Sequence, residues 1–479
     1  MNLFRSGGVN QQPADSAGRA IVVGGGLAGL AAAADLLAAG FEVHLLEGRR
    51  RCGGRAASFE SAADGSLVDA CQHVAMGCCT NFLDLCQRAG LGDLLRRDRT
   101  LWFIGPEGER AACTPANWLP APFHLAPLLL GMKHFSLGEK TALAIGMLRL
   151  AGGRFASAAP GSNEPTAAVW LAARQPERVI QLFWQPVIES ALGESIDHVG
   201  VTAVRKVVVD GFLAHPQAAD LLVPTRPLGD MFGEQLVHWL RSQGATVTTG
   251  ALVTAIERDG AGRVTGVRRG EELLAADVVV LAVPWRAAAR LVPDVLPPVD
   301  DSFVGSPITA VHLWFDRPIV DVPHAVLVGR VSQWVFPGEH AEADGGHHCQ
   351  VVISASRGLC DGDRERLLKT VVEDLEAVFP AAATATLLRS RIVTDPTAVL
   401  SVRPGIETVR PAAMTPAENL YLAGDWVATG WPSTMEGAVR SGRLAAAAAS
   451  GRSRGLVADL PKNLLVRLLV GSMRPPQQA

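Results

Sequence analysis

The sequence predicts an α/β protein in which a Rossmann-like nucleotide-binding domain is interleaved with an α+β domain for a second ligand. Near residue 20, a short β-branched run leads into a glycine-rich turn and an alanine-rich helix, the order of a nucleotide-binding βαβ unit. About 400 residues later, a strand, a Gly-Asp pair and a capped helix follow one another. The 479 residues suffice for two or three domains, and 48% of them are hydrophobic.

Composition excludes several classes of protein. The net charge of −3 gives no basic field for nucleic acid, and 19% charged residues is too few for a solvated, disordered chain. The mean hydropathy is positive, at +0.21, yet no apolar stretch approaches the ~20 residues that span a bilayer. Residues 1–18 lack an apolar signal region and read as a disordered tail, so we expect a cytoplasmic protein.

The eight cysteines form no CxxC pair, which favours free thiols in a reducing compartment. His347, His348 and Cys349 are adjacent, but no second ligand pair has matching spacing, so we expect no metal site.

The first unit reads strand, turn, helix, strand. Ala20–Val23 is a buried parallel strand, a helix runs from about Leu27 to Ala39, and Phe41–Leu46 is the second strand. Glu47 ends that strand and can accept both ribose hydroxyls of an adenosine. An acidic residue here argues against a 2′-phosphate.

The glycines between strand and helix each have a predicted role. Gly24 permits the tight turn, Gly26 lets a pyrophosphate approach the backbone, and Gly29 lets helix and strand touch. The first helical residues, Leu27 and Ala28, offer unpaired N–H groups and a partial positive charge to the phosphates.

Gly53, Gly54 and Arg55 follow the second strand, where backbone and guanidinium can reach another part of a long cofactor. This segment resembles the GGR signature of the FAD-dependent amine oxidase and carotenoid desaturase superfamily. The resemblance implies a Rossmann-like FAD-binding domain. No cysteine follows Cys360, so the C-terminal cysteine–flavin linkage of some amine oxidases is absent and we expect non-covalent FAD.

The C-terminal segment agrees with that resemblance. Asn419–Ala423 is a strand, and the following Gly424 and Asp425 would meet the ribityl and pyrophosphate region. Ser433 and Glu436 have capping-box spacing, which predicts a helix starting there. In the superfamily this helix, entered through Ser433, Thr434 and Met435, points its positive end at the flavin, where it favours the reduced anion.

Four further strands are expected in the middle of the chain, at Ala245–Thr249, Leu252–Arg258, Val264–Arg268 and Asp277–Val283. The superfamily resemblance implies that this unit returns to the nucleotide domain and that Val253 touches adenine through its backbone. The FAD-binding domain is therefore expected to comprise 19–83, 226–290 and 410–450, and the substrate domain 84–225 and 291–409, with an amphipathic segment and tail at 451–479.

Two apolar segments raise the question of lipid contact. Pro122–Met132 is short and leucine-rich, and Ser136 and Glu139 cap a helix through Leu150 whose apolar residues cover most of its surface. Leu460–Met473 is basic and amphipathic, with Leu464, Leu465, Leu468 and Leu469 on one side. Core packing and contact with a membrane surface both fit these patterns.

A closer resemblance lies in Val68–Cys78, which is similar to the D-x-G-Q-H-x-x-x-G-C segment of the hydroxysqualene dehydroxylases. Cys71 stands where that pattern has glycine. Phe183–Leu192, Leu221–Gly229 and Gly424–Gly442 also look like segments of this family.

This resemblance implies that reduced FAD removes the allylic hydroxyl of a C30 isoprenoid and gives squalene. A general acid should protonate the departing oxygen, and water must be excluded. His73 is the candidate acid and Gln72 the positioning donor, with Asp197 and His198 a weaker pair. The expected partners are the hydrophobic isoprenoid, the inner face of the membrane and upstream squalene-pathway enzymes. The oligomeric state stays open.

Three alternatives remain. A carotenoid or phytoene-type desaturase would use the same fold and run hydride from carbon to FAD. A flavin amine oxidase would want an aromatic cage, which is hard to build with Tyr421 as the single tyrosine. A non-catalytic FAD-bearing lipid carrier would share the cofactor motifs alone.

Overall fold

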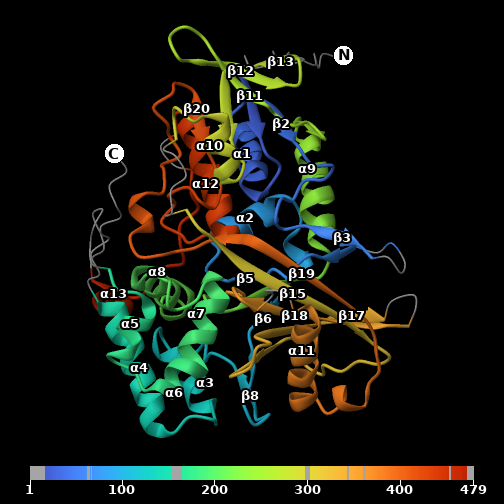
Figure 1. The fold of residues 1–479 in the computed structure, drawn as a ribbon. Coiled ribbons are helices and arrows are strands. Elements are labelled where there is room, and N and C mark those ends of the chain that lie inside the picture. Colours follow the sequence, from blue (N-terminus) through green and yellow to red (C-terminus); the bar gives the residue numbers. More distant parts are fainter. Residues whose placement is uncertain are drawn as a thin grey trace, which may run out of the picture.

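Two sheets form the two ends of the molecule (Figure 1). The computed structural model describes residues 17–61, 65, 67–153, 164–296, 303–341, 345–359, 363–452 and 455–471. One end is a five-stranded parallel sheet in the order β10-β2-β1-β14-β20, built from β1 (Arg19–Val23), β2 (Glu42–Glu47), β10 (Thr246–Thr249), β14 (Val278–Leu281) and β20 (Leu420–Leu422). Its strands come from three distant parts of the chain, and the α/β class is confirmed.

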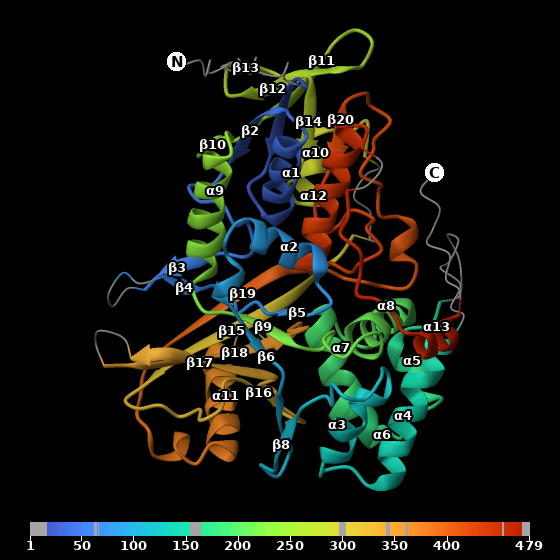
Figure 2. The same ribbon diagram turned by 180° about the vertical axis from the view of Figure 1, so that it is seen from behind.

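Helices α1 (Leu27–Ala38) and α12 (Met435–Ala449) pack against each other beside this sheet (Figure 2). Small residues permit the contact: a Cβ on Gly442 would lie 2.1 Å from the Ala28 carbonyl oxygen. Both helices are alanine-rich, and α1 is buried on nearly every side. The expected range for α1 is therefore confirmed to within one residue, and its exceptional burial explains its apolar composition.

Strands β11 (Ala255–Arg258), β12 (Val264–Arg269) and β13 (Glu272–Ala275) form a separate antiparallel sheet. The strand expected from Leu252 starts at Ala255, because the backbone at 251–254 crosses the end of β2 instead; the Ala251 N–H donates to the Glu47 carbonyl at 2.8 Å. Two small sheets link the ends: β3 (Ser58–Glu60) with β4 (Leu67–Asp69), and β5 (Ala75–Met76) with β9 (Leu221–Pro224) and β6 (Leu95–Asp98).

The second end is a seven-stranded mixed sheet in the order β19-β15-β18-β17-β16-β7-β8. The strands are β7 (Leu101–Ile104), β8 (Arg110–Cys113), β15 (Gly305–Phe315), β16 (Ala325–Leu327), β17 (Trp334–Ala341), β18 (His347–Ser354) and β19 (Leu387–Leu400). Helix α11 (Arg364–Val378) covers one face, and its residues Leu367, Val371 and Leu375 share a core with that sheet.

A group of helices stands beside the seven-stranded sheet (Figure 1). It contains α3 (Ala126–Gly131), α4 (Leu137–Gly152), α5 (Ala167–Ala172), α6 (Glu177–Val179), α7 (Gln185–Leu192), α8 (Val201–Lys206) and α13 (Leu464–Val470), while α2 (Thr80–Arg88), α9 (Leu236–Ser242) and α10 (Trp285–Leu291) lie near the parallel sheet. The expected capping box of α4 is confirmed, because Ser136 and Glu139 bond to each other's backbone N–H groups.

The two lipid-contact candidates are half docked and half exposed. On α4, Leu143 and Leu150 are buried while Ile145 and Leu148 face outward. Helix α13 is shorter than expected, and its docked face consists of Val466, Val470 and the partly buried Leu469, while Leu464, Leu465 and Leu468 are exposed. Within the described ranges, no helix is long and apolar enough to cross a membrane. Residues 1–16 and 472–479, on which parts of the tail predictions fall, lie outside the described residues.

Candidate FAD and substrate site

One cavity of ≈ 1240 Å³ runs between the parallel sheet and the group of helices. Its lining contains nearly every sequence-predicted cofactor residue, namely Gly24, Gly26, Leu27, Ala28, Glu47, Gly53, Gly54, Arg55, Val253, Gly424, Asp425, Ser433, Thr434 and Met435, together with Gln72 and His73. Segments that are up to 400 residues apart in sequence thus meet around one space. Gly29 lies behind the lining.

The glycine turn after β1 is shaped for a phosphate. Gly24 has φ of +109°, and a Cβ on Gly29 would lie 1.9 Å from the Gly24 carbonyl oxygen, so both positions require glycine. At Gly26 the nearest atom to a Cβ is the Gly54 Cα at 3.9 Å, which leaves the approach open. Helix α1 begins directly after Gly26, and its first turn carries no acidic residue among the described side chains. Its N–H groups and dipole therefore favour an anion.

At the adenosine end, Glu47 is fixed by the backbone. Its carboxylate oxygens accept the Gly25 N–H at 2.6 Å and the Arg49 N–H at 2.7 Å. Each carboxylate oxygen has a second acceptor position, so ribose hydroxyls can still bind. Val253 is buried, and within the described residues neither its N–H nor its C=O has a hydrogen-bond partner. Unpaired buried backbone groups are uncommon, and an adenine edge would satisfy them.

Arg55 and Asp425 pair with each other. Arg55 Nη2 contacts Asp425 Oδ1, Arg55 Nη1 donates to the Ala398 carbonyl at 2.8 Å, and the Ser433 hydroxyl donates to Asp425 Oδ2. Burial acts to raise the pKa of Asp425, but Arg55 and Ser433 outweigh it and the pKa is lowered. The sequence analysis expected both residues near the cofactor but did not predict that they contact each other. The ion pair forms a polar part of the cavity wall.

Helix α12 starts one residue later than expected, and the predicted Ser433–Glu436 capping box is wrong. Thr434 is the N-cap, and its side chain accepts the Gly437 N–H at 3.2 Å. Ser433 is drawn away by Asp425 and by the Leu400 N–H. The helix N-terminus still faces the cavity at Thr434 and Met435, as the dipole argument requires.

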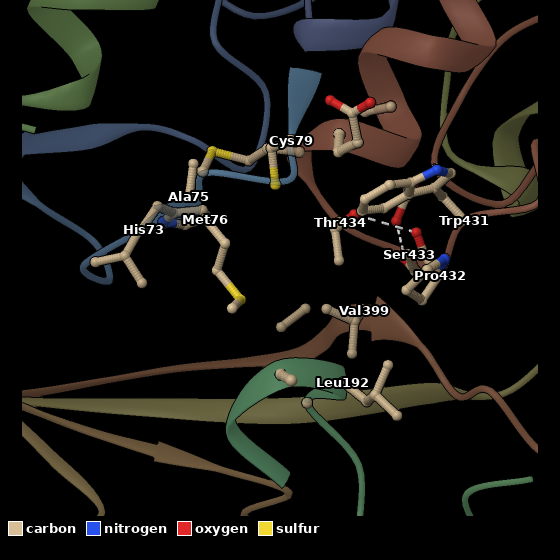
Figure 3. Close-up of a pocket in the computed structure, with 18 of the residues that line it drawn as sticks. His73, Ala75, Met76, Cys79, Leu192, Val399, Trp431, Pro432, Ser433 and Thr434 are labelled. Atoms are coloured by element: carbon tan, nitrogen blue, oxygen red, sulfur yellow. Dashed lines mark hydrogen bonds between the residues drawn. The ribbon is translucent and has the colours of Figure 1, made fainter. Parts of the chain in front are cut away.

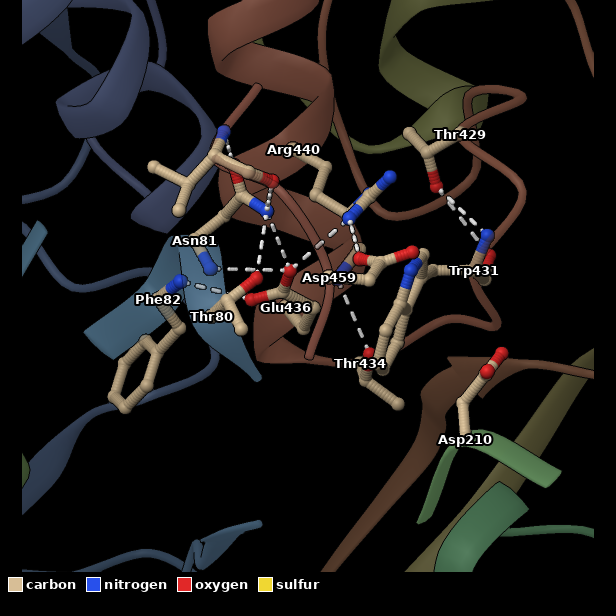
Figure 4. A network of polar contacts seen from close by, with 12 residues as sticks. Thr80, Asn81, Phe82, Asp210, Thr429, Trp431, Thr434, Glu436, Arg440 and Asp459 are labelled. Carbon is tan, nitrogen blue, oxygen red and sulfur yellow. Dashed lines mark hydrogen bonds and ion pairs between the residues drawn. The ribbon is translucent and has the colours of Figure 1, made fainter. Parts of the chain in front are cut away.

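Glu436 instead caps a different helix (Figure 4). Its carboxylate accepts the N–H groups of Asn81 and Phe82, at 3.2 and 2.8 Å, in the first turn of α2. The Asn81 side chain and Arg440 bind the same carboxylate. Burial raises the pKa of Glu436 although these donors act against the shift. The buried carboxylate therefore joins the N-termini of α2 and α12 behind the cavity.

His73 lies on the side of the cavity opposite Trp431 and Thr434 (Figure 3), and Gln72 also lines the cavity. His73 Nδ1 lies 2.8 Å from the Cys71 carbonyl oxygen, and because a carbonyl only accepts, Nδ1 carries the hydrogen. Burial lowers the pKa of His73, so the ring is neutral at neutral pH and Nε2 is an acceptor. This charge state does not suit the expected role of general acid.

Gln72 is held through its backbone. Its N–H donates to Gln350 Oε1, and Gln350 Nε2 donates to the Asp69 carbonyl at 3.2 Å. Gln350 also contacts His312, whose pKa burial lowers to about 4. Within the described parts of the chain, the Gln72 side chain hydrogen-bonds only to the His73 carbonyl, at 3.4 Å. A buried polar residue of β18 thus sets the position of the 71–73 segment.

Cys71 fits its position without backbone strain. The non-glycine residues with positive φ in the described chain are Ala355 and Asn419, so replacement of a glycine by Cys71 needs no left-handed conformation. Burial raises the pKa of the Cys71 thiol to about 12, and nearby Asp69 and Asp395 add to the shift. The residue is a neutral thiol in the cavity lining.

The remainder of the cavity is mostly apolar and comes from the helices and β7. Its lining there includes Leu101, Phe103, Phe123, Leu125, Leu128, Leu129, Met132, Leu143, Met147, Leu148, Phe183, Val187, Leu192, Phe212 and Leu213. Phe123 and Leu148 belong to this lining and are also 57% and 43% exposed. The cavity therefore reaches the surface between the 115–125 loop and α4.

Other sequence candidates lie elsewhere. Asp197 contacts Ser195 and His198 contacts Glu194, both outside the cavity lining. His348 stacks on His312 within β18 and β15, and the described residues contain no group of three potential metal ligands. Tyr421 is paired with Val280 inside the parallel sheet.

The fold and cavity agree with comparisons to known proteins. The family model of flavin-containing amine oxidoreductases matches residues 27–450. The chain belongs to this family. Its cofactor is FAD and its activity that of an FAD-dependent oxidoreductase.

Two relatives are similar at the same level of identity. The hydroxysqualene dehydroxylase of Sinorhizobium fredii is 26% identical over 458 residues, covering 89% of this chain and 96% of that protein. A 15-cis-phytoene desaturase of an Oncidium hybrid is 26% identical over 452 residues, covering 89% and 77%. Among solved structures, cyclohexylamine oxidase from Brevibacterium oxydans has a TM-score of 0.65 at 19% identity and covers 91% and 99%. That last likeness concerns the fold alone.

Sequence reasoning missed several residues of the cavity lining. Lys206, Asp210 and Asp395 line the cavity but belong to no recognised motif. Lys206 and Asp210 are four apart on a helix, a spacing that is usual for exposed ion pairs. Only the tertiary contact between Lys206 and Trp431 shows that the pair lies in the cavity wall.

Proposed function

We propose that this protein removes the hydroxyl group of a C30 isoprenoid alcohol, hydroxysqualene, and forms squalene. The observation that supports this most is the cavity, which joins the cofactor motifs to a long apolar space open to the surface at Phe123 and Leu148. The similarity to a hydroxysqualene dehydroxylase along 96% of that relative points the same way. An extended hydrocarbon fits such a lining far better than an amine.

Bound FAD, once reduced, supplies the hydride that the carbon needs. The protein's residues would hold the cofactor: the turn at Gly24–Gly29 would take the pyrophosphate, Glu47 the ribose, and the Arg55–Asp425 pair the ribityl region. The N-terminus of α12 favours negative charge on the reduced ring. The apolar lining excludes water, which would otherwise return the hydroxyl group to the carbon.

His73 acts in this proposal as an acceptor. Its Nδ1–H is engaged by the Cys71 carbonyl, so the neutral Nε2 is left as a hydrogen-bond acceptor on its side of the cavity. Gln350 holds the same segment from behind.

A phytoene-type desaturase is the second candidate, and the same histidine favours it. Desaturation removes a hydride and a proton from neighbouring carbons, and a neutral Nε2 could take that proton. The similarity to phytoene desaturases supports this reading at equal identity.

The direction of electron flow separates the two. Under anaerobic conditions, dithionite-reduced holoenzyme is mixed with hydroxysqualene, and oxidised holoenzyme with phytoene. Dehydroxylation predicts return of the oxidised flavin absorbance together with squalene in the lipid extract. Bleaching by phytoene, with no response of the reduced enzyme to hydroxysqualene, would establish the desaturase instead.

We also propose that the protein works at a membrane surface. Trp118, Phe123, Leu130, Leu137, Leu464 and Leu468 are each more than half exposed and lie on the 115–125 loop, α3, α4 and α13. Asn463 Nδ2 donates to the Ala121 carbonyl at 2.6 Å, and α13 packs on α4, so these segments form one surface around the cavity opening. Exposed Lys133, Arg149 and Arg467 lie among them and suit anionic headgroups.

A further inference from the structure

Lys206 and Asp210 form a charged pair in an otherwise apolar wall. Among the described residues from 101 to 221, they are the only charged side chains in the cavity lining. Lys206 Nζ lies 2.7 Å from Asp210 Oδ2, across the junction of α8 and the π-helical segment Val207–Leu213. A charged group beside an apolar cavity costs free energy unless it is paired, and here the two groups pair with each other.

The pair lies at the flavin end of the cavity. Lys206 Nζ is 4.5 Å from the centre of the Trp431 ring, and Trp431 is separated from the α12 N-cap Thr434 by two residues. Figure 4 shows Asp210 below Trp431 and Thr434. The ammonium group is therefore close to the part of the site where α12 faces the cofactor.

Lys206 is not required to neutralise Asp210. Lys462, from the segment before α13, places its Nζ 2.8 Å from Asp210 Oδ1. Two ammonium groups and one carboxylate leave one positive charge in excess. The neighbouring Arg205 adds to this positive charge, because its guanidinium binds the neutral carbonyls of Ala151 and Val470.

An ammonium group has three N–H donors. Asp210 accepts from one of them, and the face of Trp431 interacts with the charge. A donor remains for an acceptor inside the cavity. Because the rest of the cavity wall is apolar, the ligand that fits both the wall and this donor is an apolar molecule with a single oxygen.

We propose that Lys206 recognises the substrate by donating a hydrogen bond from Nζ to the hydroxyl oxygen of the isoprenoid alcohol. This inference rests on the proposed function and assigns the residue that distinguishes alcohol from hydrocarbon. As the C–O bond breaks, the same ammonium group can pass a proton to the departing oxygen, so that the oxygen leaves as water. Asp210 is a positioning residue that holds the lysine against the wall.

The test compares two ligands that differ by one oxygen. Dissociation constants of hydroxysqualene and squalene are measured on the oxidised holoenzyme from the change in flavin absorbance. Lys206→Met keeps the length of the side chain and removes the donor; we expect hydroxysqualene to bind about 10- to 100-fold more weakly, since a hydrogen bond from a charged group contributes about 1.5–3 kcal/mol. Squalene binding should change by less than about twofold.

Lys462→Met is the matched control. It removes the second lysine that pairs with Asp210 and changes the charge by the same amount, but Lys462 does not line the cavity. It should leave both dissociation constants within about twofold. Equal weakening of both ligands by Lys206→Met would show a packing role and overturn the proposal, as would no change in either. Should Lys206→Met fail to retain FAD, Lys206→Gln carries the same comparison with a smaller expected ratio.

Binding is measured without turnover, so the outcome is separable from the proposed function. If the wild-type protein discriminates between the ligands through Lys206 but never forms squalene, the role of Lys206 in recognition is supported and the proposed dehydroxylation is wrong. If it forms squalene and Lys206→Met keeps its preference for the alcohol, dehydroxylation holds and the role of Lys206 falls.

Discussion

Individual residues of the cofactor site divide into those whose partners are local and those whose partners are remote. The roles of Gly24, Gly29 and Glu47 were predicted because turn, helix and strand follow one another within 30 residues, and backbone geometry fixes their relation. The contact between Arg55 and Asp425 joins residues 370 positions apart, and only the packing of two sheet-end loops brings them together.

The acidic residue at the end of β2 should control FAD affinity. Glu47→Gln keeps the side-chain shape but loses the charge that two backbone N–H groups and the ribose hydroxyls share. We expect FAD to bind about 10- to 100-fold more weakly, from a loss of about 1.5–3 kcal/mol. Glu42→Gln, at the exposed start of the same strand, is the control and should have no measurable effect by fluorescence titration of the apoprotein.

His73, opposite Trp431, should cause the reaction rate to fall on the acidic side of its pH profile. Because burial lowers the pKa of His73, protonation occurs below the ordinary histidine value and removes the Nε2 acceptor. Single-turnover rates should therefore fall as the pH decreases through that range and stay level above it. His73→Gln should retain FAD, react at least about tenfold more slowly and lose this fall at low pH. A rate that increases toward low pH would assign His73 as an acid instead.

At the scale of elements, helix ends were less predictable than helices. The sequence indicated α1, α4 and α12, since periodicity and capping residues are local signals. It misplaced the start of α12, because Ser433 and Glu436 have the spacing of a capping box while their side chains serve Asp425 and α2. It also misjudged α13, where Val466 and Val470 dock and, of the four leucines, Leu469 alone packs against the core.

The buried link between α2 and α12 should be important for stability. Glu436→Ala leaves the N–H groups of Asn81 and Phe82 without an acceptor in a dry environment. We expect a decrease in the free energy of unfolding of about 2–4 kcal/mol, measured by chemical denaturation of the holoenzyme. Glu365→Ala, in the exposed first turn of α11, should cost less than about 0.5 kcal/mol. Equal losses would contradict the cross-helix cap.

Two helix glycines should respond in opposite directions to alanine. A Cβ at Gly442 would lie 2.1 Å from the Ala28 carbonyl oxygen, so Gly442→Ala should separate α1 from α12 and destabilise the protein by more than about 2 kcal/mol. Gly138 in α4 is exposed, and its nearest neighbour to a Cβ is the Ser136 hydroxyl at 4.0 Å. Gly138→Ala should stabilise by up to about 1 kcal/mol, as thermal unfolding would show.

At the scale of the whole molecule, the positive mean hydropathy has two sources. Most of it belongs to the buried strands and helices around the parallel sheet, which are apolar on both faces. The rest lies on the surface around the cavity opening. Sequence patterns identified both apolar segments but could not say which side of each helix docks, because that depends on the contact between α4 and α13.

That surface should bind anionic membranes. Replacing Leu464 and Leu468 with glutamate removes two exposed leucines and adds two negative charges. We expect co-sedimentation with phosphatidylglycerol vesicles to weaken at least about tenfold. Leu273→Glu, at an exposed leucine of β13, should bind as the wild type does. If the wild-type protein ignores such vesicles, the membrane proposal is wrong while the cofactor site is unaffected.

The central claim is that hydride passes from reduced FAD to the carbon that carried the hydroxyl group. The most direct measurement is a single turnover in D₂O, where the exchangeable N5 position of the reduced flavin carries deuterium, followed by mass analysis of the product. The account predicts squalene that is one mass unit heavier, with deuterium at that carbon. Squalene without deuterium, or hydroxysqualene recovered unchanged from fully reduced holoenzyme, would contradict it.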